Sequence, residues 1–178
     1  MALSCLTDPH AHLQATLDEG ILELVLNRPE RKNALFSDFY LAIEQALLDA
    51  ETDKSVRVVL LRGVADDFSA GNDMQDFAKG NLGGIDAPPF RLLRAAASLS
   101  KPLLIAVKGV AIGIGTTLLL HADMVLADSK ARFQMPFASL GLSPEGCASL
   151  LLPRMAGYHK AAELLRRLRD AGADVQVA

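Results

Sequence analysis

The sequence predicts a single domain of the α/β class. Residues 56–63 and 103–109 are short runs dense in apolar, mostly branched residues that each end at a glycine, which is typical of buried strands in a parallel or mixed sheet. Segments with helical spacing of apolar residues, such as 38–52, separate these runs. Alternating strands and helices favour a layered α/β arrangement, and 178 residues, 51% of them hydrophobic, suit one core.

The chain is expected to begin with a β-hairpin. Residues 12–17 and 21–26 alternate in polarity around the turn at 18–20, which ends in glycine. Pro29 follows the second strand and cannot donate to a central ladder, so the strand must end before it. The hairpin is therefore followed by a break in regular structure.

Helices and strands then alternate to the end of the chain. Ser37 is predicted to cap the helix 38–52, with Asp38 favourably placed in its first turn. The further elements expected are, in order, the strand 56–63, a helical turn at 74–78, a surface loop at 80–89, a helix at 91–100, the strand 103–109, a helix opened by glycines at 113–122, short strands at 124–128 and 132–135, and a basic amphipathic helix at 158–169.

Composition excludes several function classes. A formal net charge of −3 argues against a nucleic-acid partner, and the most apolar span, 102–120, is too interrupted for a membrane helix. Cys5 and Cys147 fit no metal spacing and no disulfide framework, so we expect two reduced thiols and no metal. The N-terminus lacks the pattern of a signal peptide. We therefore expect a cytoplasmic protein.

One carboxylate stands out by its surroundings. Glu145, in the segment PFASLGLSPEG, is the only charged residue between Arg132 and Arg154. It is either a proton-transfer group or part of a helix start, with Ser143 as N-cap and Pro144 at the first helical position. These residues alone leave both interpretations open.

Three segments taken together resemble the crotonase, or enoyl-CoA hydratase/isomerase, family. They are NRPERKNAL at 27–35, FSAGNDMQDF at 68–77, and the long segment 101–157, which opens KPLLIAVKGVAIGIG. The resemblance implies a crotonase-like spiral of ββα units over 1–157, with 158–178 as the start of a shortened or divergent C-terminal helical region. It also implies an acyl-CoA thioester substrate, no cofactor beyond the coenzyme A of that substrate, and a homotrimer or hexamer.

The same resemblance implies an oxyanion hole. Its two donors would be the backbone N–H groups of Ala70 and Ile114, which stabilise negative charge developing on the thioester oxygen. Gly71, Gly113 and Gly115 flank these positions and allow the backbone to approach a ligand closely.

The acid–base residues distinguish branches of the family. Hydratases carry two glutamates that activate water, and the equivalent positions here fall at Thr117 and Phe137, neither of which is a carboxylate. The SPEG segment, with AGND in place of the commoner AGAD, resembles the Δ3,Δ2-enoyl-CoA isomerase branch. There a single glutamate, Glu145 by this match, moves a proton from C2 to C4. Its apolar surroundings are expected to raise its pKa towards the working range.

Further residues are implied to contact the substrate. Arg28 and Lys32 suit the phosphates of coenzyme A, although both also suit a solvated turn. Asp73 is either a substrate-side residue or a helix cap. The remaining residues of the predicted substrate site are Ala34, Gly71, Asn72, Met74, Gly113, Gly115, Phe137 and Leu140.

Other functions stay open at this point. A shortened, non-catalytic acyl-CoA-binding or assembly subunit is one, because RRLRDAGADVQVA departs from the family's usual continuation. A hydratase that uses Glu145 with another group is a second. Ser69, His121 and Asp123 form no recognisable hydrolytic motif, so structural roles are expected for all three.

Overall fold

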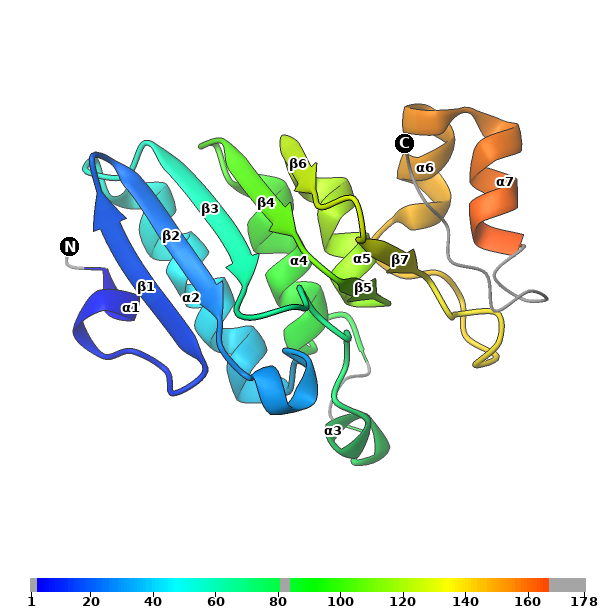
Figure 1. Ribbon diagram of the computed structural model, residues 1–178, viewed down its shortest axis with the longest axis horizontal. Helices are drawn as coiled ribbons and strands as arrows, with labels where there is room; N and C mark the ends of the chain where they lie inside the picture. The colour runs from blue at the N-terminus through cyan, green and yellow to red at the C-terminus, as the bar shows by residue number, and fades with distance from the viewer. Residues whose placement is uncertain (1–2, 81–83, 167–178) are drawn as a thin grey trace.

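The computed structural model describes residues 3–80 and 84–166, and its centre is a five-stranded sheet (Figure 1). The strand order is β1-β2-β3-β4-β6; the β1–β2 pair is antiparallel and the other pairs are parallel. A second, two-stranded parallel sheet pairs β5 with β7. The strands are β1 Leu13–Asp18, β2 Ile21–Leu26, β3 Val58–Gly63, β4 Leu103–Val107, β5 Val110–Ile112, β6 Met124–Ala127 and β7 Arg132–Gln134.

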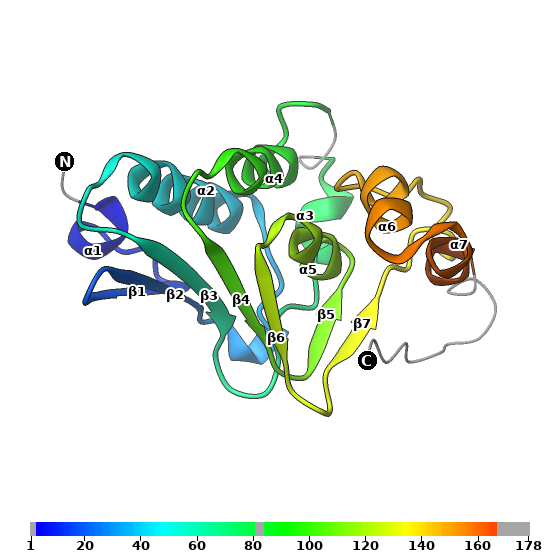
Figure 2. The ribbon, with the colours of Figure 1, turned by 90° about the horizontal axis from the view of Figure 1, so that it is seen from above.

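Helices cover one face of the main sheet (Figure 2). There α2 and α4 pack side by side, and between them and the sheet lies the main hydrophobic core, which includes Leu24, Phe39, Leu61 and Leu92. The helices are α1 Ser4–Thr7, α2 Ser37–Thr52, α3 Met74–Ala78, α4 Pro88–Ser98, α5 Ile114–Thr117, α6 Ala148–Ala156 and α7 Tyr158–Arg166, with 3-10 turns at Pro29–Arg31 and Leu118–His121.

The predicted hairpin is confirmed, and so are the parallel strands. Leu13 pairs with Leu26 and Asp18 with Ile21, around a turn in which Glu19 and Gly20 have positive φ. Along β3 the exposure alternates, so burial is one-sided where a strand buried on both faces was expected. The reason is that α2 and α4 cover a single face of this sheet.

The predicted cap of α2 is wrong. Ser37 is the first helical residue and Phe36 occupies the cap position without a side-chain hydrogen bond. Instead, the carboxylate of Asp76 in α3 accepts hydrogen bonds from the Ser37 N–H at 2.7 Å and from its hydroxyl at 2.6 Å. A residue 39 positions away therefore satisfies the helix start.

The helix start at Ser143–Glu145, one of the two interpretations left open for Glu145, is not formed. The helix α6 begins at Ala148, after Cys147 in a left-handed conformation, so Glu145 lies in the preceding loop. The helix expected at 113–122 is divided into α5 and the 3-10 turn Leu118–His121. The predicted helix 158–169 is found as α7 up to Arg166, and positions 167–169 lie outside the described residues.

A second, smaller hydrophobic cluster lies beside the main core. It joins α6 and α7 to the loop before them (Figure 1). Its buried members are Met135, Phe137, Ala148, Leu152, Ala161 and Leu164. The loop 135–147, which carries Glu145, therefore contributes Met135 and Phe137 to this second cluster.

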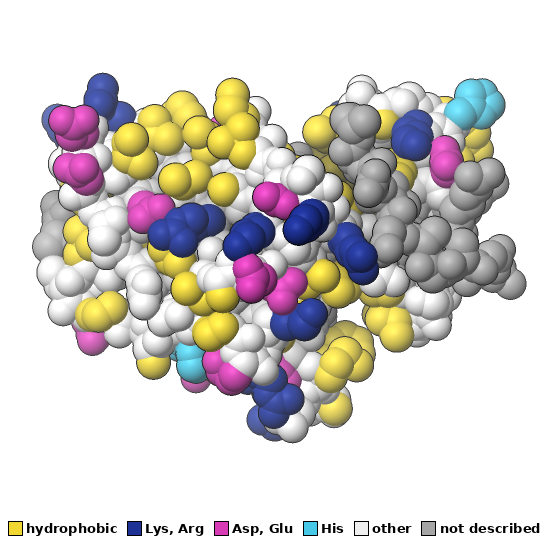
Figure 3. Space-filling view, in the orientation of Figure 1, with side chains coloured by type: hydrophobic (Ala, Val, Ile, Leu, Met, Phe, Trp, Pro, Cys, Tyr) yellow, Lys and Arg dark blue, Asp and Glu magenta, His cyan; other side chains and the backbone are white. Residues whose placement is uncertain are grey.

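Charges of both signs are mixed on the sheet face that carries no helices (Figure 3). Arg62 pairs with Glu23 at 2.7 Å and Lys108 pairs with Asp66 at 2.6 Å. Within residues 3–80 and 84–166, no helix combines the length and the apolar character that crossing a bilayer requires.

Candidate active site

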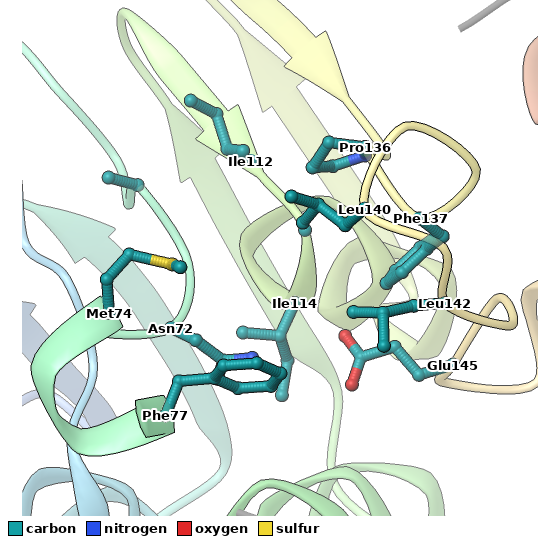
Figure 4. Close-up of a pocket in the computed structure, with 12 residues that line it drawn as sticks. Asn72, Met74, Phe77, Ile112, Ile114, Pro136, Phe137, Leu140, Leu142 and Glu145 are labelled. Atoms are coloured by element: carbon teal, nitrogen blue, oxygen red, sulfur yellow. The ribbon is translucent and has the colours of Figure 1, made fainter. Parts of the chain in front are cut away.

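A cavity of about 200 Å³ lies between α3, the turn from β5 to α5, and the loop 135–147 (Figure 4). It is lined mainly by apolar side chains, and among the described residues that line it Glu145 is the only ionisable one. The lining residues are Ala70, Asn72, Met74, Phe77, Ile112, Gly113, Ile114, Pro136, Phe137, Leu140, Leu142 and Glu145. A neighbouring cavity of about 420 Å³ shares Asn72, Phe77, Phe137, Leu142 and Glu145 with it and extends towards Phe90 of α4.

The segment 69–73 brings backbone groups to this cavity. On one side, Ser69 exchanges hydrogen bonds with β5. On the other side, the Ala70 N–H donates to the carbonyl of Lys32 at 2.8 Å. Because this N–H is already engaged, the expected role of Ala70 as an oxyanion donor needs correction, although Ala70 does line the cavity.

The N–H of Asn72 is in a different position. Leu35 pairs with the two residues that flank Asn72. The Leu35 N–H donates to the Gly71 carbonyl, and the Asp73 N–H donates to the Leu35 carbonyl, both at 2.8 Å. Neighbouring N–H groups of an extended chain point to opposite sides, so that of Asn72 faces away from Leu35. Among the described residues it donates to no acceptor.

The turn from β5 to α5 presents a second such group. Gly113 has φ +56° and ψ −119°, a conformation that favours glycine, and its N–H donates to the Gln134 carbonyl at 2.8 Å. Ile114 then begins α5, where no intrahelical acceptor exists for its N–H, and this N–H makes no hydrogen bond within the described part of the chain.

Two glycines allow these segments to approach each other. A Cβ on Gly71 would lie 2.4 Å from the Ile112 carbonyl oxygen and 3.7 Å from the Ile114 nitrogen. A Cβ on Gly115 would lie 2.9 Å from the Ser69 carbonyl oxygen. These glycines therefore bring the N–H groups of Asn72 and Ile114 to one wall of the cavity, whereas the predicted close approach of this backbone to a ligand stays a prediction.

Glu145 reaches the cavity from the opposite wall, with Phe137 and Leu142 beside it (Figure 4). Burial raises the pKa of its carboxyl above the ordinary value, and a hydrogen bond from Thr117 acts in the opposite direction. The Thr117 hydroxyl lies 3.2 Å from Glu145 Oε1. A carboxylate whose pKa is raised in this way is a better proton acceptor and is suited to accept and return a proton.

Tyr40 connects the two walls electrostatically. Its hydroxyl donates to the side-chain oxygen of Asn72 at 2.5 Å. Burial raises the pKa of this phenol well above its ordinary value, and the charges of Glu145 and Asp76 raise it further. Tyr40 therefore stays neutral and holds the Asn72 amide in one orientation.

The basic residues predicted for the coenzyme A phosphates differ in availability. Arg28 is largely buried, and it pairs with Asp73 at 2.7 Å and donates to the Ala34 carbonyl at 2.9 Å. Lys32 keeps 61% of its side chain exposed, with its amine 3.6 Å from Asp67. Arg28 is thus engaged inside the protein, whereas Lys32 extends into solvent.

Asp73 serves as a helix cap, one of its two expected roles. It accepts a hydrogen bond from the Gln75 N–H at the start of α3. Burial opposes ionisation of its carboxyl, but hydrogen bonds from Arg28 and Gln75 hold the pKa below the ordinary value. The predicted substrate-site residues that do not line the 200 Å³ cavity are Arg28, Lys32, Ala34, Gly71, Asp73 and Gly115.

Four residues of the cavity wall were not predicted: Phe77, Ile112, Pro136 and Leu142. A signal existed for Phe77, because it follows Met74 by three positions in a helical turn and so shares its face. Ile112, Pro136 and Leu142 each lie within two positions of a predicted site residue. The sequence could not identify them, because loop conformation decides which of these side chains face the cavity.

Ser69, His121 and Asp123 each hydrogen-bond to a backbone group elsewhere, in line with the structural roles expected for them. The Ser69 hydroxyl donates to the Asn33 carbonyl at 2.9 Å, and Asp123 accepts from the Leu103 N–H at 2.8 Å. The His121 ring lies 3.0 Å from the Gly146 carbonyl oxygen. Nor do His, Cys, Asp and Glu side chains of the described ranges gather in any group able to hold a metal ion.

Comparison with known proteins connects this geometry to a family. Residues 16–174 match the sequence model of a family described as enoyl-CoA hydratase/isomerase. The chain is 36% identical over 156 residues to mouse "Enoyl-CoA delta isomerase 3, peroxisomal", covering 84% of this chain and 49% of that protein. It is 38% identical over 160 residues to human "Enoyl-CoA delta isomerase 2", covering 86% and 40%.

Solved structures agree with this match. A crystal structure from Acinetobacter baumannii, described provisionally as an enoyl-CoA hydratase/isomerase, superposes with a TM-score of 0.86 at 60% identity, over 89% of this chain and 66% of that one. An enoyl-CoA hydratase/isomerase from Pseudoalteromonas atlantica gives a TM-score of 0.81 at 43% identity, over 86% and 61%. The chain thus spans 40–49% of the two curated relatives and about two thirds of the solved chains.

Proposed function

The chain belongs to the enoyl-CoA hydratase/isomerase family, and from this premise we propose that it shifts the double bond of a 3-enoyl-CoA thioester to the 2-position. The observation that carries the proposal is the pairing of one carboxylate with two unengaged N–H groups across an apolar cavity. A double-bond shift moves one proton and consumes no water, so a single acid–base group is sufficient.

Glu145 acts first as a base and then as an acid. It removes a proton from C2, and the electrons of that C–H bond form a dienolate whose negative charge rests on the thioester oxygen. The N–H groups of Asn72 and Ile114 stabilise this charge. The carbonyl then re-forms, C4 takes the proton back from Glu145, and the double bond lies between C2 and C3.

Two features support this role against hydration. The positions where hydratases of this family place two glutamates hold Thr117 and Phe137, and Phe137 packs in the second hydrophobic cluster. Within residues 3–80 and 84–166, no second carboxylate lines the 200 Å³ cavity to activate water. We further propose that Lys32 contacts the phosphates of coenzyme A, because its charge extends into solvent, whereas that of Arg28 is engaged by Asp73.

The experiment compares the protein with its Glu145→Gln variant on a 3-enoyl-CoA. We expect formation of the conjugated 2-enoyl product to fall roughly 10²–10⁴-fold, because the amide cannot take a proton. Acyl-CoA binding, measured by calorimetry, is expected to be retained, since glutamine has the same shape.

Three outcomes distinguish the alternatives. Unchanged turnover of Glu145→Gln would reject the assignment of the base. Hydration of a 2-enoyl-CoA by the unmodified protein would identify a hydratase with unusual acid–base residues. Acyl-CoA binding without turnover of either substrate would identify a non-catalytic binding subunit.

A further inference from the structure

Thr117 stands where it can control the orientation of Glu145. Its side chain is fully buried in α5, and its hydroxyl lies 3.2 Å from Glu145 Oε1. Within the described ranges, this is the only hydrogen bond that the Glu145 carboxylate makes. The second oxygen, Oε2, is therefore left without a protein donor, in a side chain that lines the cavity.

The loop is built to pass directly against Thr117. Gly146, the residue after Glu145, has φ +61°, and a Cβ there would lie 2.7 Å from the Thr117 Cβ and 3.0 Å from its hydroxyl oxygen. Any larger residue at position 146 would push the loop away from α5. The absence of a side chain is what allows the hydroxyl to reach the carboxylate.

A second contact holds the same loop. The His121 ring nitrogen Nε2 lies 3.0 Å from the Gly146 carbonyl oxygen, which requires this nitrogen to donate. Burial lowers the pKa of His121, so the ring is neutral near pH 7 and donates through Nε2. Thr117 and His121 therefore contact two successive residues of the loop, Glu145 and Gly146.

We propose that Thr117 is the positioning residue of Glu145: its hydroxyl holds Oε1 and leaves Oε2 as the oxygen that exchanges the proton with substrate. The inference rests on the proposed function and adds a residue to it. A hydroxyl donates to Oε1 whether Oε2 is ionised or protonated, so one hydrogen bond holds the carboxyl through both halves of the reaction. Thr117, at a position where hydratases of this family place a glutamate, thus serves to orient the single carboxylate.

The test uses Thr117→Val, which keeps the shape and removes the hydroxyl, with Thr117→Ser as the matched variant that keeps the hydroxyl. The titration of Glu145 is followed by ¹³C NMR of its side-chain carboxyl, assigned by its loss in Glu145→Gln. We expect the titration midpoint to move to higher pH in Thr117→Val, because the ionised form loses its donor, and to stay near the original value in Thr117→Ser.

Turnover supplies the second measurement. In Thr117→Val we expect kcat for the 3-enoyl-CoA to fall roughly ten- to a hundredfold, with KM changed by less than about twofold, as for a hydrogen bond to a charged group. Thr117→Ser is expected to recover most of kcat. If Thr117→Val does not fold, Thr117→Ala must give the same upward movement of the midpoint.

Two results would overturn the inference. One is a Glu145 midpoint and kcat in Thr117→Val equal to those of the unmodified protein. The other is an equal loss in the Val and Ser variants, which would assign Thr117 a packing role against Gly146. A protein that turns over no substrate would contradict the proposed function, yet the Glu145 titration would still decide the role of Thr117.

Discussion

The surroundings of Glu145 disfavour its ionised form, and this couples catalysis to stability. Burial raises its pKa in the folded protein above the unfolded value, so the folded state binds the proton more tightly than the unfolded state does. The contribution of Glu145 to the free energy of unfolding is therefore fully present below the pKa of the unfolded state. It is lost as the pH rises through the pKa of the folded state. At neutral pH, ionised Glu145 destabilises the fold.

Replacing this charge is expected to stabilise the protein. Glu145→Gln should raise the melting temperature by a few degrees at pH 7, and the difference should shrink below pH 4.5, the ordinary Glu value. The control is Glu51→Gln: Ser100 lowers the Glu51 pKa, so that variant should lose stability at pH 7. A lower melting temperature of Glu145→Gln at pH 7 would contradict the prediction.

The first oxyanion donor is reassigned from Ala70 to Asn72 on the hydrogen bonding of single backbone N–H groups. The test therefore removes these N–H groups one at a time. Replacing the peptide N–H of Asn72 by an ester oxygen, through incorporation of the matching hydroxy acid, should lower kcat on the order of 10²–10³-fold, because one oxyanion donor is removed. The same replacement at Ala70 removes the hydrogen bond to Lys32 and should lower stability with much less effect on kcat. A larger loss of kcat at Ala70 than at Asn72 would restore the original assignment.

At the scale of elements, α3 links the helix α2 to the cavity. Asp76 of α3 supplies the carboxylate that satisfies the start of α2, while Met74 and Phe77 of the same short helix line the cavity. A five-residue helix has little stability of its own, so its position depends on such tertiary contacts.

Removal of this contact should therefore affect both elements. Asp76→Ala is expected to lower the free energy of unfolding by roughly 1–2 kcal/mol, as for the loss of a helix cap, and to raise KM through displacement of Phe77. Urea denaturation and steady-state kinetics measure the two effects. Asp38→Ala, which changes an exposed acid in the first turn of α2, should change stability by only a few tenths of a kcal/mol, and an equal loss in both variants would contradict the role given to Asp76.

What the sequence could predict depends on how local each feature is. The hairpin, the parallel strands and the positions of Glu145 and Ile114 follow from short patterns and from the resemblance, and the crotonase fold is confirmed. The helix start at Ser37 and the donor at Ala70 were wrong because distant residues decide them. Asp76 replaces the expected cap, and Lys32 engages the N–H of Ala70. No local pattern records such a pairing.

At the scale of the whole molecule, strand β6 is incompletely covered. It lies at the edge of the main sheet, and Met124 and Leu126 are 53% and 54% exposed. An apolar edge strand of this kind favours association between chains. The homotrimer or hexamer implied by the family resemblance stays a prediction, and the exposed apolar edge strand supports it.

Sedimentation velocity tests it. The chain is expected to sediment as a trimer or hexamer, and Leu126→Glu should weaken association roughly tenfold or more, because a charge would be buried. Leu48→Glu, at a comparably exposed position on α2, serves as the control. A monomer at every concentration, or equal effects of both variants, would contradict the prediction.

The loop 135–147 gives the proposed reaction a mechanical sensitivity. The N–H groups of Asn72 and Ile114 belong to segments packed into the main core, whereas Glu145 follows Phe137 of the second cluster. The loop that carries Glu145 thus contacts both clusters: its Phe137 packs in the second cluster, whereas Thr117 and His121, from the segment that also carries Ile114, hold Glu145 and Gly146. A substitution within α6 or α7 that shifts Phe137 would therefore strain the loop against these two contacts and slow the reaction without changing any group that meets the substrate.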